Sequence, residues 1–233
     1  ESSLQADLGV DFNSDHISAG FSLFYNNIDN FIFYHKLESG NGGDSLVAVD
    51  GELIPAFRFD QRKARLAGLE LVVDIHPHPL DWLHVENTFS LVNGRFKEAL
   101  EGTRNMPLIP AARLVSELRG DFLEQGRRVR NLSVKLQAEH NFQQDNAFTG
   151  YDTETPTDSY TLFNAGISAD IMGKSATLFS LYFTVMNIGD VAWQSHLSRL
   201  KYTAINPVTN RAGVFNAGRN FSFKINVPLS FRL

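Results

Sequence analysis

Residues 132–139 read Leu132-Ser133-Val134-Lys135-Leu136-Gln137-Ala138-Glu139, so that apolar and polar side chains alternate one by one. Consecutive side chains of a β-strand point to opposite faces, and this stretch therefore predicts a strand with one apolar and one polar face. No window of comparable length in the sequence shows a sustained apolar stripe with the 3.6-residue period of a helix. We therefore predict an all-β chain.

The same alternation recurs along the whole sequence. We predict nine strands, near residues 2–12, 16–38, 55–76, 82–96, 111–123, 130–143, 159–171, 176–188 and 218–232. Most of these segments are longer than ten residues, whereas strands of soluble proteins usually have 3–10. A tilted strand that crosses a bilayer needs about 9–11 residues of alternating character. The strand lengths therefore favour a membrane barrel.

The connections between the predicted strands alternate in length. Short turns are predicted at 13–15, 76–79 and 172–175, and long polar or Gly/Pro-rich loops at 38–54, 97–110, 144–159 and 188–217. The turn at 124–130 is longer and basic, and fits the scheme less well. Short periplasmic turns and long extracellular loops are typical of outer-membrane barrels, so we predict an antiparallel up-and-down transmembrane β-barrel. A soluble β-sandwich binding module also shows alternation and is the alternative fold.

Nine strands is an odd number. A single-chain bacterial barrel has an even number, with both ends in the periplasm, so we expect about nine strands of a larger barrel. A tenth, weak strand near residues 199–205 would remove this argument. The chain begins at Glu1 without a basic and apolar leader, which also leads us to expect a processed chain or a fragment.

Composition excludes several classes of function. The 233 residues are 43% hydrophobic and carry 21 basic and 26 acidic side chains, for a net charge of −5. A nucleic-acid partner is therefore not expected, because it requires a basic footprint. The sequence has no cysteine, which excludes disulfides, thiolate metal ligands and a thiol nucleophile. It also has no run of 18 apolar residues, so no transmembrane helix is expected.

Several short motifs resemble those of the TonB-dependent outer-membrane receptors of Gram-negative bacteria. In chain order they are Glu1-Ser2-Ser3 with Gly9, the run Phe59–Glu70 (FDQRKARLAGLE), the run Met106–Arg113 (MPLIPAAR), Asn187-Ile188-Gly189-Asp190, the run Ser195–Lys201 (SHLSRLK), and Gly218-Arg219-Asn220 before the last alternating segment. Their order and spacing extend over nearly the whole chain. The last residue is Leu233, where outer-membrane barrels often end in Phe.

The resemblance implies that residues 1–233 are the C-terminal part of a 22-stranded barrel domain, without the N-terminal plug domain of this family. It also implies a location in the bacterial outer membrane, where the partners are outer-membrane lipid, the missing plug and barrel strands, and, through the plug, the TonB complex. The function implied is receptor-mediated, energy-dependent uptake of a scarce solute, above all a ferric siderophore or a related metal chelate (siderophore uptake, iron transport). In such a receptor the extracellular loops bind the solute and the barrel wall encloses the plug.

The sequence carries no recognisable catalytic signature. The sequence contains no H-E-x-x-H, no G-x-S-x-G, no P-loop and no G-x-G-x-x-G, so we expect neither an enzyme nor a cofactor. His76 and His78 lie in a proline-interrupted turn with no third ligand nearby in sequence, so no metal site is predicted. A smaller outer-membrane barrel that serves as an enzyme or adhesin is the alternative function.

Candidate ligand-binding residues lie in the long loops, because loops on a rigid scaffold commonly carry binding. They are the aromatic and charged side chains Tyr151, Trp193, His196, Arg199 and Arg211. His196 and Arg199 also fall within the SHLSRLK run that resembles the receptor family.

Overall fold

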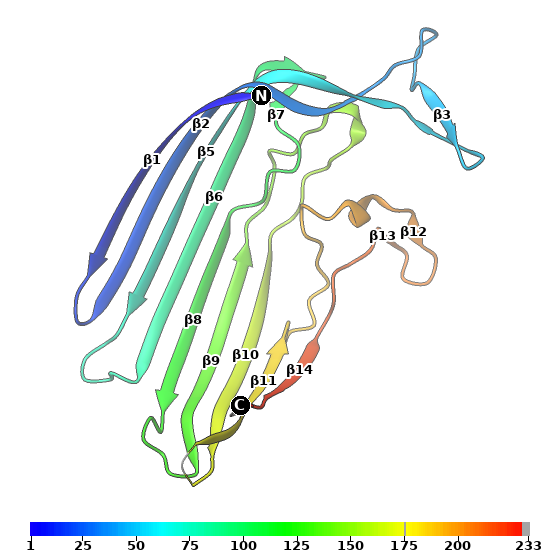
Figure 1. Cartoon of the computed structure of the whole chain (residues 1–233). Coiled ribbons are helices and arrows are strands. Elements are labelled where there is room, and N and C mark those ends of the chain that lie inside the picture. The colour runs from blue at the N-terminus through cyan, green and yellow to red at the C-terminus, as the bar shows by residue number, and fades with distance from the viewer. Residues whose placement is uncertain (175, 230–233) are drawn as a thin grey trace, which may run out of the picture.

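A computed structural model describes residues 1–174 and 176–229 and shows one curved antiparallel sheet (Figure 1). The strands that follow one another across it are β1 (Ser2–Asn13), β2 (Ile17–Lys36), β5 (Phe57–Ile75), β6 (Leu83–Leu100), β8 (Arg113–Phe122), β9 (Val129–Asn141), β10 (Tyr160–Met172), β11 (Thr177–Met186) and β14 (Asn220–Asn226). A short strand, β7 (Thr103–Asn105), pairs with the end of β6. Each of these wall strands pairs with the wall strand that precedes it in the chain, as in an up-and-down barrel.

The nine predicted strands are all confirmed, with ends within a few residues of those expected. β14 differs most, since it was predicted to continue to residue 232 but ends at Asn226. Pro228 has no N–H to donate to a sheet ladder, which accounts for the early end. Residues 230–232 of the predicted strand lie outside the described residues.

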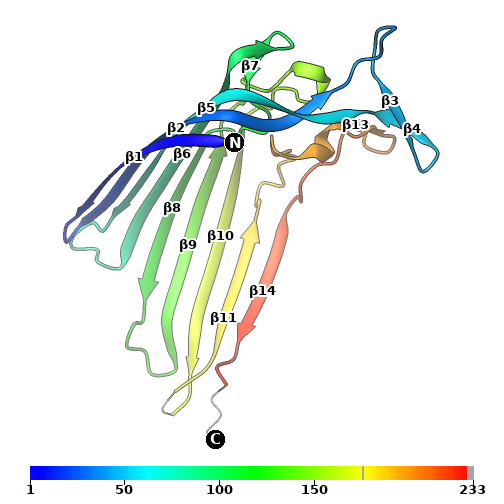
Figure 2. The ribbon, with the colours of Figure 1, turned by 45° about the horizontal axis from the view of Figure 1, so that its top comes forward.

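No tenth wall strand forms near residues 199–205 within the described chain. Arg199–Tyr202 is a 3₁₀ turn, η2, and β12 (Ile205–Asn206) pairs only with β13 (Arg211–Ala212) in a separate small hairpin. A second hairpin, β3 (Leu46–Val49) with β4 (Glu52–Pro55), lies where the sequence predicted an irregular loop. Both hairpins are peripheral to the main sheet (Figure 2). No helix in the described part of the chain is long and apolar enough to cross a membrane.

Short and long connections gather at opposite ends of the sheet (Figure 1). At the turn end, residues 14–16, 76–82, 123–128 and 173–176 join neighbouring strands. At the loop end, the connections are residues 37–56, 101–112, 142–159 and 187–219. The predicted alternation is therefore correct, and the basic turn that fitted it less well also lies at the turn end. This arrangement matches the periplasmic turns and extracellular loops of an outer-membrane barrel.

The two faces of the sheet differ in polarity. On the outer face, Leu71 of β5 pairs with Phe21 of β2 and Phe89 of β6, and the side chain of Leu71 is 39% exposed. On the inner face, Glu117 of β8 pairs with Gln137 of β9. A β-sandwich would bury the apolar face against a second sheet, and no second large sheet exists among the described residues. An exposed apolar face is instead what a lipid-facing barrel wall requires.

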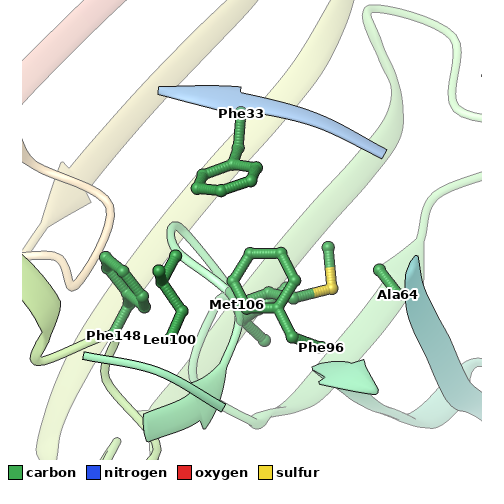
Figure 3. Close-up of a cluster of buried hydrophobic side chains, with 7 residues drawn as sticks. Phe33, Ala64, Phe96, Leu100, Met106 and Phe148 are labelled. Carbon is green, nitrogen blue, oxygen red and sulfur yellow. The ribbon is translucent and has the colours of Figure 1, made fainter. Parts of the chain in front are cut away.

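The main buried apolar cluster lies at the loop end, on the inner face (Figure 3). Its members are Phe33, Ala64, Phe96, Leu100, Met106, Ile109 and Phe148. Strands β2, β5 and β6 contribute the first residues, whereas Met106, Ile109 and Phe148 come from two long loops. Full burial of a large apolar side chain contributes about 1.5–3 kcal/mol, so the cluster fastens these loops to the inner wall.

The opposite faces of β5 predict a sharp contrast between two neighbouring substitutions. We expect Leu71→Arg to lower the free energy of unfolding of the full-length protein in lipid vesicles by about 2–4 kcal/mol, because the charge would face hydrocarbon near mid-depth. Glu70→Arg is the matched control, since Glu70 is exposed on the inner face, and we expect it to change the free energy by less than about 1 kcal/mol. Denaturant unfolding measures both values, and equal effects would contradict the assigned faces.

Candidate functional site

Three long loops meet above the inner wall at the loop end. The Gln144 side chain, 6% exposed, donates hydrogen bonds to the carbonyl oxygens of Ile109 at 3.1 Å and Pro110 at 2.9 Å. The backbone N–H of Thr155 donates to the Tyr202 hydroxyl at 3.2 Å. The loop 142–159 thus contacts both 101–112 and 187–219, and it is the central element of this assembly.

Glu154 is the buried carboxylate at the junction of these loops. Its side chain is 5% exposed and accepts hydrogen bonds from the backbone N–H groups of Leu108 at 2.6 Å and Phe148 at 3.1 Å. Its Oε2 atom also lies 3.7 Å from His196 Nε2. Burial alone would raise the pKa of Glu154, but His196 and the two backbone donors outweigh burial and hold this pKa below its ordinary value.

The half-buried Thr157 and the buried Lys201 extend this contact. The Nδ1 atom of His196 lies 2.8 Å from the Thr157 hydroxyl, and Lys201 Nζ donates to the same hydroxyl and, at 3.0 Å, to the Thr155 carbonyl oxygen. His196 is 5% exposed and Lys201 8%. Glu154, Thr157, His196 and Lys201 together are called the Glu154 network below. Buried charges are stable when paired and hydrogen-bonded, so the network holds three loops in one arrangement.

Of the five residues predicted to bind ligand, the structure places His196 inside this network rather than at the surface. His196 is 5% exposed, and it also lines a second hollow of about 200 Å³ together with Arg113 and Tyr160. The SHLSRLK run therefore supplies buried members of the network, His196 and Lys201, together with the exposed Arg199. Loop composition alone did not identify Glu154, Thr157 or Lys201, because neither the burial of a charged loop residue nor a hydrogen bond between two loops has a local sequence signal.

The four long connections at the loop end, residues 37–56, 101–112, 142–159 and 187–219, are together called the mouth below. Tyr151 lies on the side of the mouth nearest β2. It is half-buried in η1 (Gly150–Asp152), with its ring centroid 5.8 Å from that of Phe148 and 5.4 Å from that of His35. Its hydroxyl is buried without a hydrogen-bond partner among the described residues, and burial raises its pKa. The phenol is therefore a neutral donor available to a further group.

Of the other predicted residues, Trp193 lines a hollow on the side nearest β10, Arg211 lies next to its lining, and the exposed Arg199 does not line it. Trp193 donates from its indole nitrogen to the Ala217 carbonyl oxygen at 3.3 Å, and its ring centroid is 5.0 Å from that of Tyr160. The hollow has a volume of about 350 Å³ and is lined by Trp193, Lys201 and Phe215, among others. Arg211 is exposed, with its guanidinium carbon 5.2 Å from the Phe215 ring centroid. Tyr151 is thus not part of the hollow near Trp193.

The inner wall below the mouth carries paired charges. Arg113 of β8 forms a bidentate contact with Glu139 of β9, at 2.9 and 2.8 Å. Lys135 of β9 lies 3.3 Å from Glu117 of β8. Such pairs on alternating inward positions are what a wet lumen allows and a lipid-facing surface does not.

One group of side chains has the composition and spacing of a metal site. Asp74, His76 and His84 have ligand atoms within 4.8 Å of one another, on the inner wall at the turn end. The sequence predicted no metal site because His76 and His78 lacked a third ligand. The structure instead brings His76 together with Asp74 and with His84 of the adjacent strand, a pairing that depends on strand register.

Comparison with known families identifies the barrel. A model of the TonB-dependent receptor-like β-barrel matches residues 1–188. The chain belongs to the TonB-dependent receptor family. The predicted resemblance is thereby confirmed, and so is the barrel over the β-sandwich. Members of this family are outer-membrane receptors and transporters of Gram-negative bacteria.

Solved structures show the same fold. The copper transporter OprC has a TM-score of 0.72 at 16% identity, and the ferric citrate transporter FecA has 0.64 at 19%; each comparison covers 97% of this chain and 31% of the other. The FrpB iron transporter from Neisseria meningitidis, in its F5-1 variant, has a TM-score of 0.62 at 12% identity, again over 97% and 31%. The chain therefore spans about a third of the length of these transporters. No curated protein matches the chain.

The low pKa of Glu154 predicts that the loops of this TonB-dependent receptor loosen in acid. A depressed pKa stabilises the folded loops above the ordinary glutamate value of 4.5 and loses this effect as pH falls through the lower folded-state value. We expect hydrogen-exchange protection at Leu108 and Phe148, corrected for intrinsic exchange, to fall over that range.

The Glu154→Gln variant tests whether the Glu154 carboxylate causes this acid dependence. It should lower protection of the same two amides about tenfold at neutral pH, since charge-assisted hydrogen bonds are worth about 1.5–3 kcal/mol, and should remove the acid dependence. An identical pH profile in the two proteins would show that Glu154 does not hold the loops.

Proposed function

We propose that the protein containing this chain is an energy-dependent outer-membrane transporter of a metal chelate, with a ferric siderophore as the leading candidate. Family membership carries the proposal. It is supported by the names of the structural neighbours, which are transporters of copper, ferric citrate and iron. The loop-end mouth, with its fastened loops, is the surface on which such a solute would first bind.

The solute class follows from the side chains at the mouth. Arg199 and Arg211 are exposed, and guanidinium groups bind carboxylates and similar oxyanions through paired hydrogen bonds. Trp193 beside the 350 Å³ hollow would contact the apolar or aromatic parts of a chelate, and the Tyr151 hydroxyl, which has no hydrogen-bond partner among the described residues, would donate to one of its oxygen atoms. We assign solute contact to these four residues, and to His196 the support of the loops from below.

The partners follow from the sheet edges and the inner wall. β1 pairs only with β2, and β14 only with β11, among the described residues. Unpaired strand edges are not stable in lipid, so further strands of the same receptor would complete the barrel around residues 1–233. A plug from outside this chain would fill the charged lumen, and the TonB complex would act through that plug. Outer-membrane lipid would cover the apolar face.

An uptake assay with the full-length receptor tests this function. Cells that express it should accumulate a radiolabelled ferric chelate only when the TonB complex and the proton-motive force are intact, while surface binding should persist without them. Accumulation that is independent of energy, or absent for all iron and copper chelates tried, would overturn the proposal. A surface enzyme or adhesin would accumulate none of these chelates.

The arginines at the mouth provide the residue-level prediction. We expect Arg199→Ala and Arg211→Ala each to weaken binding of an anionic ferric chelate about tenfold, because each loses a charge-assisted hydrogen bond. Arg127→Ala is the matched control, since Arg127 is an exposed arginine at the turn end, and we expect no change. Equilibrium binding to whole cells without energy measures the affinity, and an equal loss in all three variants would reject the assigned site.

A further inference from the structure

Four of the seven histidines lie at the turn end of β2, β5 and β6. They are His16, His76, His78 and His84. Within the described part of the chain, two of these four, His76 and His84, lie close enough to a carboxylate, that of Asp74, for all three side chains to bind one ion. The group lies at the end of the inner wall opposite the mouth, so it is separate from the site assigned to the transported solute.

Strand geometry explains why these three side chains converge. Asp74 and His76 are two residues apart at the end of β5, which places them on the same face. Ile75 pairs with Val85 of β6, so the next positions along, His76 and His84, lie opposite each other. Their ring centroids are 4.3 Å apart. An alternating pair on one strand and a residue opposite on the next thus form a triangle of potential ligands.

The distances are close to those of a metal site. His76 Nε2 lies 2.7 Å and His84 Nδ1 3.5 Å from Asp74 Oδ2, and all ligand atoms fall within 4.8 Å. Metal–nitrogen and metal–oxygen bonds of about 2.0–2.2 Å place ligands on one tetrahedral ion about 3.4 Å apart. Movements of roughly 1 Å by the side chains would therefore complete the coordination.

Asp74 has a second, unused oxygen. Its Oδ1 atom is buried and has no hydrogen-bond partner among the described residues. A buried acceptor without a partner is costly, and a bound cation would relieve that cost. The three side chains are 16–34% exposed, which leaves a path for an ion from the lumen.

The surroundings also resemble those of a metal site. The second ring nitrogen of His84, Nε2, lies 3.6 Å from Asp121 Oδ2, and metal-bound histidines commonly present their other nitrogen to a carboxylate. Arg119 contacts both Asp121, at 3.1 Å, and Glu86, at 2.6 Å. Asp74, Glu86 and Asp121 thus bring three negative charges to this region against the one positive charge of Arg119, and this local acidic excess favours a cation.

We propose that Asp74, His76 and His84 form a binding site for a divalent first-row transition-metal ion on the inner wall at the turn end. Two imidazoles and one carboxylate suit Zn²⁺, Cu²⁺ and similar ions rather than Mg²⁺ or Ca²⁺, which prefer all-oxygen ligands. The fourth position faces the lumen, where water or a group from another part of the receptor completes the shell. This site does not depend on which solute the mouth captures.

The test uses the full-length receptor in detergent, purified without a histidine tag and stripped of metal. One equivalent of Cu²⁺ should give an electron paramagnetic resonance spectrum with coupling to two nitrogens, and a chromogenic chelator competition should show Zn²⁺ bound at this site. His84→Gln and His76→Gln should each leave coupling to a single nitrogen and weaken Zn²⁺ binding at least about tenfold. Asp121→Asn should weaken it about tenfold with both nitrogens retained.

His78→Gln is the matched control, because His78 lies in the same turn, is 68% exposed and faces Asp81 instead of the triad. It should bind both ions like the wild type. The proposal is overturned if the wild type lacks the two-nitrogen signal, if the His76→Gln/His84→Gln double variant binds like the wild type, or if His78→Gln loses as much affinity as His84→Gln. Heat-modifiable gel mobility reports folding, and the wild-type spectrum decides the question even if a variant does not fold.

Discussion

Backbone pairing between neighbouring strands is the constraint on which the rest of this molecule depends. Hydrocarbon offers no hydrogen-bond partners, so a spanning strand must satisfy its N–H and C=O groups on the strands beside it. The register from β1 to β14 does this, and it leaves side chains to alternate between two environments. The outer residues, such as Leu71 and Leu136, can then be apolar and exposed, while Glu117 and Lys135 pair inside.

A wall built in this way has almost no core of its own, and its stabilising apolar contacts are concentrated where the loops fold back. Phe96 of β6 is fully buried because loop residues such as Met106 and Phe148 cover the loop-end parts of β5 and β6. The Glu154 network adds polar contacts that are specific to one loop arrangement. The mouth is therefore held by two kinds of interaction, apolar burial near β2 and β5, and buried hydrogen bonds near β8 and β10.

The same register has different consequences at the two ends of the lumen. At the loop end it positions Arg113 and Glu139 beneath the loops, where charges pair with each other. At the turn end it brings His84 beside Asp74 and His76, with one carboxylate oxygen left without a partner. The first arrangement is a satisfied wall. The second retains unused ligand capacity, which is why the turn end carries the metal-site proposal.

Alternation over more than ten residues, with short and long connections in turn, was enough to predict the nine strands, their two faces and a membrane barrel, because a period of two is a local property of the chain. The family was predicted from the resemblance of short motifs, such as the run Phe59–Glu70. Local signals also marked the loops that carry Tyr151, Trp193, Arg199 and Arg211. They could not show that His196 and Lys201 are buried, that β3 and β4 pair, or that His84 faces His76. Burial and cross-strand contact join residues that are distant in sequence or separated by a turn, and only the register of the folded sheet and the packing of its loops decide them.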